Sequence, residues 1–164
     1  MTMREIKFRV WSPELADYRT LSEISNNHGL GMGFEVTSGI GGSVTQIYCS
    51  VGDTPEQYTG IKDKNGVEIY EGDIVEVEYE SGRHTIMDSQ TLGMVDQWVD
   101  IETTLRGRVC IWPSKGVVLT SIVVGNPEQF ADAQQTPPQW LHVTKCHLVA
   151  GNIHENPELL EGTK

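Results

Sequence analysis

The sequence contains no long apolar run. No segment approaches the ~20 consecutive apolar residues that a membrane-spanning helix requires. The first residues, MTMREIKFRVW, also lack an apolar run after their charges, unlike a secretory signal peptide. We therefore expect neither a transmembrane helix nor a signal peptide.

Cysteine is scarce. The three cysteines, Cys49, Cys110 and Cys146, are odd in number and far apart along the chain. Small secreted domains stabilised by disulfides instead carry an even number of cysteines at close spacings. We therefore expect reduced thiols and a cytoplasmic location.

Basic residues are few. The chain has 12 Lys and Arg against 23 Asp and Glu, which gives a formal net charge of −11. A chain of this charge repels the phosphate backbone of nucleic acids, so nucleic-acid binding is the least favoured class of function. The charge favours solubility and a basic protein partner. Mimicry of DNA is a minor alternative, because the acidic residues are scattered apart from one cluster between Glu68 and Glu80.

The familiar catalytic and metal-binding motifs are missing. The chain has no G-x-S-x-G, H-E-x-x-H or Walker sequence, and we expect no enzymatic activity, no metal and no cofactor. A calcium loop that starts at Asp63 would need an oxygen ligand at its fifth position, which is Val67. In HVTKCH, a strand would place His142 and Cys146 on one face and His147 on the other, too few ligands for zinc.

Short segments rich in β-branched and aromatic residues, separated by turn residues, make up most of the chain. With 17 Gly, 7 Pro and 38% hydrophobic residues, the composition is typical of a mainly β or α+β domain. Strands are expected in REIKFRVW, SVTQIYCSV, GVEIY, DIVEVEYE, LRGRVCIW, GVVLTSIVV and WLHVTKCHLVA, and GDTPEQYTG is expected to be a loop. Short helices are expected after Ser12 and Asn126 and in NPELL. The pattern predicts a small barrel or a strongly bent sheet.

The segment QYTGIKDKNGVEIYEGDIVEV, residues 57–77, predicts a hairpin turn followed by a half-buried strand. Asn65 and Gly66 tolerate the positive φ angles of a tight turn. Beyond the turn, Glu76, Glu78 and Glu80 fall on one face of a strand, which favours a solvated outer face.

Three segments together resemble the YopX family of phage and prophage proteins. They are REIKFRVW at residues 4–11, QYTGIKDKNGVEIYEGDIVEV at 57–77 and VAGNIHENPELL at 149–160. The resemblance implies a bacteriophage or prophage accessory protein. It also implies a β-rich fold with an SH3-like barrel in its C-terminal part and a tendency to self-assemble. It does not imply an enzyme, because the family has no agreed catalytic residues.

The chain is expected to form one compact unit of two portions. Residues 1–56 form a β-rich segment with a glycine-rich loop, and residues 57–164 form the SH3-like portion, with an inserted arm at 81–105 and a short helix at 126–135. Three segments depart from the family pattern: 29–42, 81–105 and 126–140. Binding function concentrates in loops on rigid scaffolds, so a specific function is expected in these segments.

The remaining candidate site combines basic and aromatic residues. Arg106, Arg108 and Lys115 lie on or beside a predicted strand pair near Trp112. Such a cluster can hold the phosphate and base of a nucleotide, and a charged strand face is the alternative interpretation.

These observations favour a binding protein. The leading hypothesis is a non-catalytic bacteriophage accessory protein that forms a homo-oligomer in the host bacterial cytoplasm. It counters host machinery or host defence by binding a host protein. The alternatives are sequestration of a small signalling nucleotide in a pocket between subunits and a cryptic hydrolase in the unusual segments. Nucleic-acid binding ranks last because of the charge.

Overall fold

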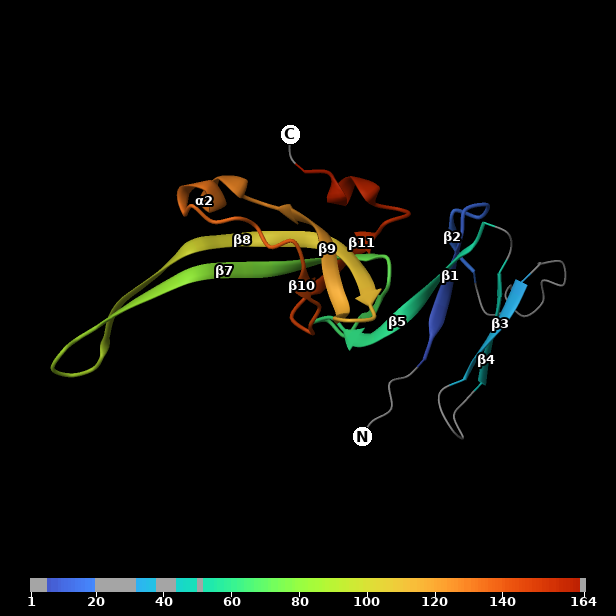
Figure 1. Cartoon of the computed structure of the whole chain (residues 1–164), viewed down its shortest axis with the longest axis horizontal. Helices are drawn as coiled ribbons and strands as arrows, with labels where there is room; N and C mark the ends of the chain where they lie inside the picture. The colour runs from blue at the N-terminus through green and yellow to red at the C-terminus, as the bar shows by residue number, and fades with distance from the viewer. Residues whose placement is uncertain (1–5, 20–31, 38–43, 50–51, 163–164) are drawn as a thin grey trace.

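The chain folds mainly into β-strands. The computed structural model describes residues 6–19, 32–37, 44–49 and 52–162. This part contains a four-stranded sheet of order β2-β1-β5-β6, a five-stranded sheet of order β10-β9-β8-β7-β11 and a two-stranded sheet of β3 and β4 (Figure 1). The prediction of a mainly β fold with a bent, barrel-like sheet is confirmed.

The four-stranded sheet brings the beginning of the chain against its middle. Its strands are β1 (Phe8–Ser12), β2 (Asp17–Tyr18), β5 (Thr54–Lys62) and β6 (Glu68–Tyr70). β5 runs antiparallel to β1, and it continues through residue 56 into the segment that resembles the family. The expectation that GDTPEQYTG forms a loop is wrong, because pairing with β1 makes residues from Thr54 onward a strand and buries Tyr58.

The helix expected after Ser12 is also absent from the described residues. Residues 13–16 form a turn, and β2 pairs with β1 through Trp11 and Tyr18. A helix of three turns is marginal without tertiary support. Here the tertiary contacts favour the hairpin instead, since Arg19 forms a buried ion pair with Asp53 at 2.6 Å.

The five-stranded sheet is a curled half-barrel. Its strands are β7 (Asp73–Met87), β8 (Met94–Trp112), β9 (Gly116–Val124), β10 (Leu141–His142) and β11 (Leu148–Asn152). One hydrophobic cluster lies inside the curl and contains Ile69, Val75, Val109, Leu119 and Val143.

A second cluster lies under the predicted helix after Asn126. Helix α2 (Pro127–Asp132) begins with proline as expected, and its Phe130 packs on Ile101 and Leu105 of β8. The predicted turn of helix in NPELL is the 3-10 helix η1 (Pro157–Leu160). No described helix has both the length and the apolar character needed to cross a membrane.

The strand expected over residues 140–150 is interrupted. β10 ends at His142, and a turn closed by the N–H of His147 donating to the carbonyl of Thr144 at 3.2 Å separates it from β11. The prediction that His142 and Cys146 share one strand face is therefore wrong. The interruption lets β10 pair with β9 and β11 pair with β7, on opposite edges of one sheet.

The turn in KDKNG joins β5 to β6 as predicted. Gly66 has a φ of 82° and the N–H of Gly66 donates to the carbonyl of Asp63 at 3.0 Å. Asn65 does not adopt a positive φ, so glycine alone supplies the left-handed residue.

The glycine-rich region is only partly described. β3 (Met32–Thr37) pairs antiparallel with β4 (Val44–Cys49), which places a strand in SVTQIYCSV as predicted. Residues 29–31 and 38–42 of the candidate segment 29–42 lie outside the described residues.

The segment 81–105 forms most of a long hairpin arm made by β7 and β8. β7 and β8 stay paired from Ile74 and Arg108 at the base to Met87 and Met94 at the tip. In Figure 1 the two strands leave the body side by side and extend well beyond it.

Candidate functional site

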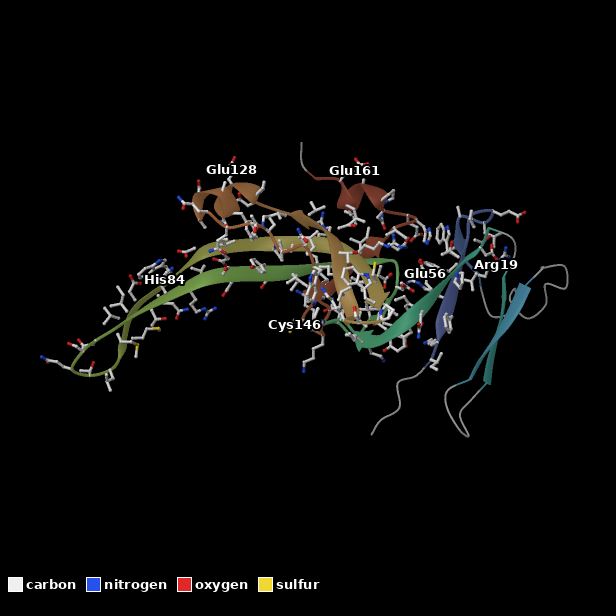
Figure 2. The ribbon with its side chains drawn as sticks, viewed as in Figure 1. Arg19, Glu56, His84, Glu128, Cys146 and Glu161 are labelled. Atoms are coloured by element: carbon white, nitrogen blue, oxygen red, sulfur yellow. The ribbon has the colours of Figure 1, made fainter. Side chains whose placement is uncertain are left out.

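A buried ionic cluster joins the two large sheets. Glu56 on β5 accepts hydrogen bonds from Nε of Arg9 at 2.7 Å and from the hydroxyl of Tyr18 at 3.0 Å, and Nε2 of His154 lies 2.8 Å from its other oxygen. Arg9 also donates to Asp73 at 2.5 Å. Figure 2 places Glu56 where the two sheets meet.

Aromatic rings surround this cluster. The Arg9 guanidinium lies 4.3 Å from the ring centre of Tyr18 and 4.6 Å from that of Tyr70, so two rings enclose it. Trp11 stacks on the His154 ring at 4.7 Å. Burial raises the pKa of the Tyr18 hydroxyl and that of Asp73, although Arg9 opposes both shifts.

The cluster serves the architecture. Each of its charged groups has a partner inside it, so none is left to bind a ligand. Arg9, Asp73 and His154 come respectively from the three segments that carry the family resemblance. Those segments therefore lie close together in the folded chain. Spacing in the sequence does not indicate this, because residues in contact, such as Glu56 and His154, are 98 residues apart.

The four predicted ligand residues do not converge on one cavity. Arg106 donates to Glu76 on the neighbouring strand at 2.6 Å. Arg108 is exposed on β8, opposite Ile74 and Thr120. The other two, Trp112 and Lys115, lie at the far end of the β8–β9 hairpin.

Trp112 and Lys115 meet an aromatic residue that the sequence did not single out. The Lys115 ammonium lies 3.8 Å from the ring centre of Trp140 and 5.3 Å from that of Trp112. His142 packs edge-on against Trp140. The predicted association of Lys115 with Trp112 is thus present, and segment 126–140 supplies its second ring.

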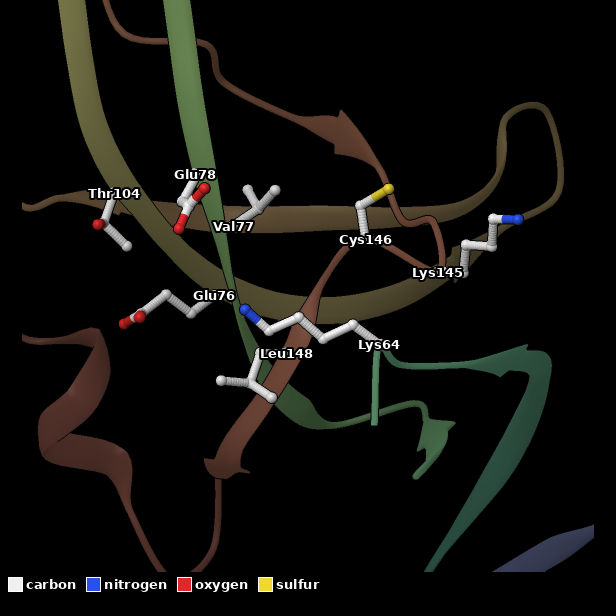
Figure 3. Close-up of a pocket in the computed structure, with 8 residues that line it drawn as sticks. All are labelled: Lys64, Glu76, Val77, Glu78, Thr104, Lys145, Cys146 and Leu148. Atoms are coloured by element: carbon white, nitrogen blue, oxygen red, sulfur yellow. The ribbon is translucent and has the colours of Figure 1, made fainter. Parts of the chain in front are cut away.

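A pocket of about 500 Å³ lies at the base of the arm (Figure 3). Its lining comes from β7, β8, the KDKNG turn, the turn between β10 and β11, and the first residue of β11: Lys64, Glu76, Val77, Glu78, Thr104, Lys145, Cys146 and Leu148. In Figure 3 the Lys64 side chain extends between Glu76 and Leu148. The pocket combines apolar walls with charges of both signs.

The residues of HVTKCH do not assemble a metal site. Cys146 is exposed and lines the pocket, whereas His147 is buried. Burial lowers the pKa of His147, and its Nε2 finds no hydrogen-bond partner among the described residues. Within the described part of the chain, no three His, Cys, Asp or Glu side chains gather as ligands for a metal ion.

The tip of the arm is apolar and exposed. The arm tip is defined here as residues 86–98. It holds six of the eight large hydrophobic residues that are exposed in the described part: Ile86, Met87, Leu92, Met94, Val95 and Trp98. Leu92 is 74% exposed and Val95 is 64% exposed. Scattered apolar residues are ordinary on protein surfaces, but a contiguous apolar patch marks an interaction site.

Comparisons with known proteins identify a family. The family model described as YopX protein matches residues 7–161. No curated protein matches the sequence. Among solved structures, the chain is similar to protein EF1440 from Enterococcus faecalis, with 22% sequence identity and a TM-score of 0.40 over 96% of this chain and 99% of that chain.

Proposed function

The chain belongs to the YopX family, and we propose that it is a non-catalytic binding protein whose β7–β8 arm contacts another protein chain. The concentration of exposed apolar side chains at the arm tip carries this proposal. Burying apolar surface stabilises by ~25 cal/mol per Å², so residues left bare at the end of an arm gain most from a partner surface.

The construction of the arm supports the same function. A two-stranded hairpin without a covering layer is marginally stable in water. Short contacts along the arm hold it in shape, since His84 stacks on Trp98 at 5.0 Å and its Nε2 lies 2.9 Å from Asp100. The ribbon is thus ordered before binding, which lowers the entropy cost of association.

The proposed setting is that of a bacteriophage accessory protein. In this proposal the protein acts in the cytoplasm of the host bacterium and counters host machinery or host defence by binding a host protein. The net charge of −11 favours a partner with a basic surface around an apolar groove.

Site-specific photocrosslinking in bacterial cells tests the arm as the contact element. A photoreactive phenylalanine analogue replaces Leu92 at the arm tip, and the matched control replaces Leu15, which is 48% exposed in the turn between β1 and β2. The proposal expects a discrete protein adduct from position 92 that is weaker or absent from position 15. Equal labelling from both positions, or none from position 92, would contradict it.

A second candidate function is the binding of a small nucleotide. It is favoured by Lys115 between Trp112 and Trp140, which offers a cation and two stacking rings. Thermal unfolding against a panel of nucleotides, with Trp140→Ala as the matched variant, tests it. Stabilisation that the variant loses supports nucleotide binding, and no stabilisation by any nucleotide refutes it.

A further inference from the structure

We infer that the arm binds a second copy of this chain by reciprocal exchange, in which the arm tip of each copy lies in the pocket at the base of the other copy's arm. The inference rests on the proposed function, because it takes the arm as the binding element. It adds the identity of the partner and the surface that receives the tip.

The receiving pocket is less acidic than the chain as a whole. Lys64 and Lys145 line it, and neither forms a salt bridge with any described residue. Of its two carboxylates, Glu76 is neutralised by Arg106 at 2.6 Å. The lining itself has two cations and two carboxylates, and Arg106 beside it makes three cations against two, although the whole chain carries −11. Val77 and Leu148 supply the apolar wall.

The arm tip has the complementary chemistry. It carries Asp88 and Asp96 and has no Lys or Arg. Its apolar side chains match the apolar wall of the pocket, and its carboxylates match the two lysines. A hydrophobic centre with opposite charges at the rim is the usual composition of a specific protein interface.

The placement of tip and pocket permits a closed pair. From Val77, which lines the pocket, to Met87 at the tip, the outer edge of β7 has no strand partner among the described residues. This edge is about 33 Å long at the usual rise per residue. If two arms lie antiparallel along these edges, each tip reaches the other pocket. With two-fold symmetry both contacts form at once, and no arm or pocket is left free to bind a third copy.

The start of β11 limits how far a second arm can extend along the edge of β7. β11 pairs with β7 only from Leu148 and Glu76 onward, so it occupies the edge where the pocket ends. A second arm lying along β7 would end against Cys146 and Leu148, which line the pocket. The exchange would also cover two exposed edges that otherwise risk uncontrolled strand pairing. A host protein that needs the arm tip must then compete with the second copy.

Disulfide trapping of the full-length protein tests the exchange. The variant Leu92→Cys adds a thiol at the tip, while the native Cys146 is exposed in the pocket. Mild oxidation is expected to give a covalent dimer, with a disulfide between residues 92 and 146 identified by mass spectrometry. Leu92→Cys combined with Cys146→Ser is expected to lose this dimer, and Leu15→Cys is expected not to form it. A dimer that survives Cys146→Ser, or no dimer at any protein concentration, would overturn the inference.

A charge exchange provides an independent readout without new thiols. In analytical ultracentrifugation, Lys64→Glu with Lys145→Glu is expected to weaken dimerisation by about tenfold or more, and Asp96→Lys is expected to do the same. The combined triple variant should recover the dimer, whereas a further loss overturns the inference. If the wild-type protein is monomeric but position 92 still photocrosslinks to another protein, the exchange fails while the proposed function stands. If position 92 yields no adduct to any chain, the proposed function fails as well.

Discussion

Nε2 of His154 lies 2.8 Å from Oε1 of Glu56, and this contact joins the turn after β11 to β5. Glu56 is 3% exposed, and it also accepts from Arg9 and Tyr18. The buried Glu56 carboxylate thus helps to hold the four-stranded sheet against the half-barrel, together with the Arg9–Asp73 ion pair.

Replacing this carboxylate should strongly destabilise the protein. Glu56→Gln leaves the half-buried Arg9 with Asp73 as its remaining counterion, and removing one partner of a buried ion pair costs about 3–5 kcal/mol. Urea unfolding at pH 7 should show this decrease in the free energy of unfolding. Glu14→Gln, on an exposed turn, is the matched control and should change it by less than about 0.5 kcal/mol. Equal effects of the two variants would mean that the cluster does not hold the sheets together.

Asp63 should make the stability depend on acidic pH. Burial alone would raise the pKa of Asp63, but hydrogen bonds from the N–H groups of Val67, Val149 and Asn65 lower it below the ordinary 3.8. A folded pKa below the unfolded one gives stabilisation that is complete above pH 3.8 and is lost as the pH falls through the lower folded value.

Asp63→Asn should therefore cost stability at neutral pH and less in acid. The expected loss at pH 7 is about 1–3 kcal/mol, since the N–H of Val149 would face an amide group in place of a charged acceptor. Urea unfolding of both proteins at pH 7, 5 and about 3 measures the difference, which should shrink toward low pH. Asp132→Asn on the exposed part of α2 serves as the control. A difference that grows on acidification would contradict the assignment.

Gly107 should not tolerate a methyl group. A Cβ built there would lie 2.6 Å from the carbonyl oxygen of Thr120 and 2.8 Å from Cγ of Leu119, at the irregularity where β8 meets β9. Gly107→Ala should lower the free energy of unfolding by about 1–3 kcal/mol through overpacking. Gly162→Ala, whose Cβ would meet open space, should have almost no effect. Chemical denaturation of the pair measures the contrast, and a neutral Gly107→Ala would show that the two strands can separate without cost.

The arm should be dispensable for folding. Replacing residues 84–98 by Asn-Gly would close the hairpin after the Arg83 and Val99 pair with a turn suited to two-residue loops. The cluster of Ile101, Leu105 and Phe130 lies below this cut. Thermal unfolding should shift by less than about 4 °C, the change that ~1 kcal/mol produces in a domain of this size. A larger decrease would mean that the arm stabilises the body.

Local chemistry was predictable where the decisive interactions are short-range. Gly66 and Gly72 mark turns because only glycine adopts φ angles of 82° and 87° without strain. Pro127 opens α2 because its missing N–H costs nothing at a first helical position. The alternation in DIVEVEYE indicated a strand, and Val75 is indeed buried while Glu78 is exposed.

The failed expectations share one cause. The sequence of TPEQYTG predicts a loop, but pairing with β1 makes it a strand. The residues after Ser12 predict a helix, but the hydrogen bond from Tyr18 to Glu56 belongs to a hairpin. The continuous strand expected after Trp140 divides because its two halves pair with different edges of the sheet. Each outcome depends on a partner far away in sequence.

The candidate sites divide in the same way. The association of Trp112 with Lys115 was predictable because both lie within four residues on one hairpin. The contribution of Trp140 was not, because it comes from another segment. The sequence predicted an arm at 81–105, yet it contained no sign that a pocket lies at the base of that arm.

By itself, the sequence determined the strand content, the main turns, the arm and the family, because these follow from local propensity, glycine and proline geometry, and a recognisable pattern. Only the tertiary structure decided which distant segments pair, which charges are buried together and where the apolar tip stands relative to the pocket. Burial and strand pairing act between residues that are neighbours in space, and the chain reveals those neighbours only when it is folded.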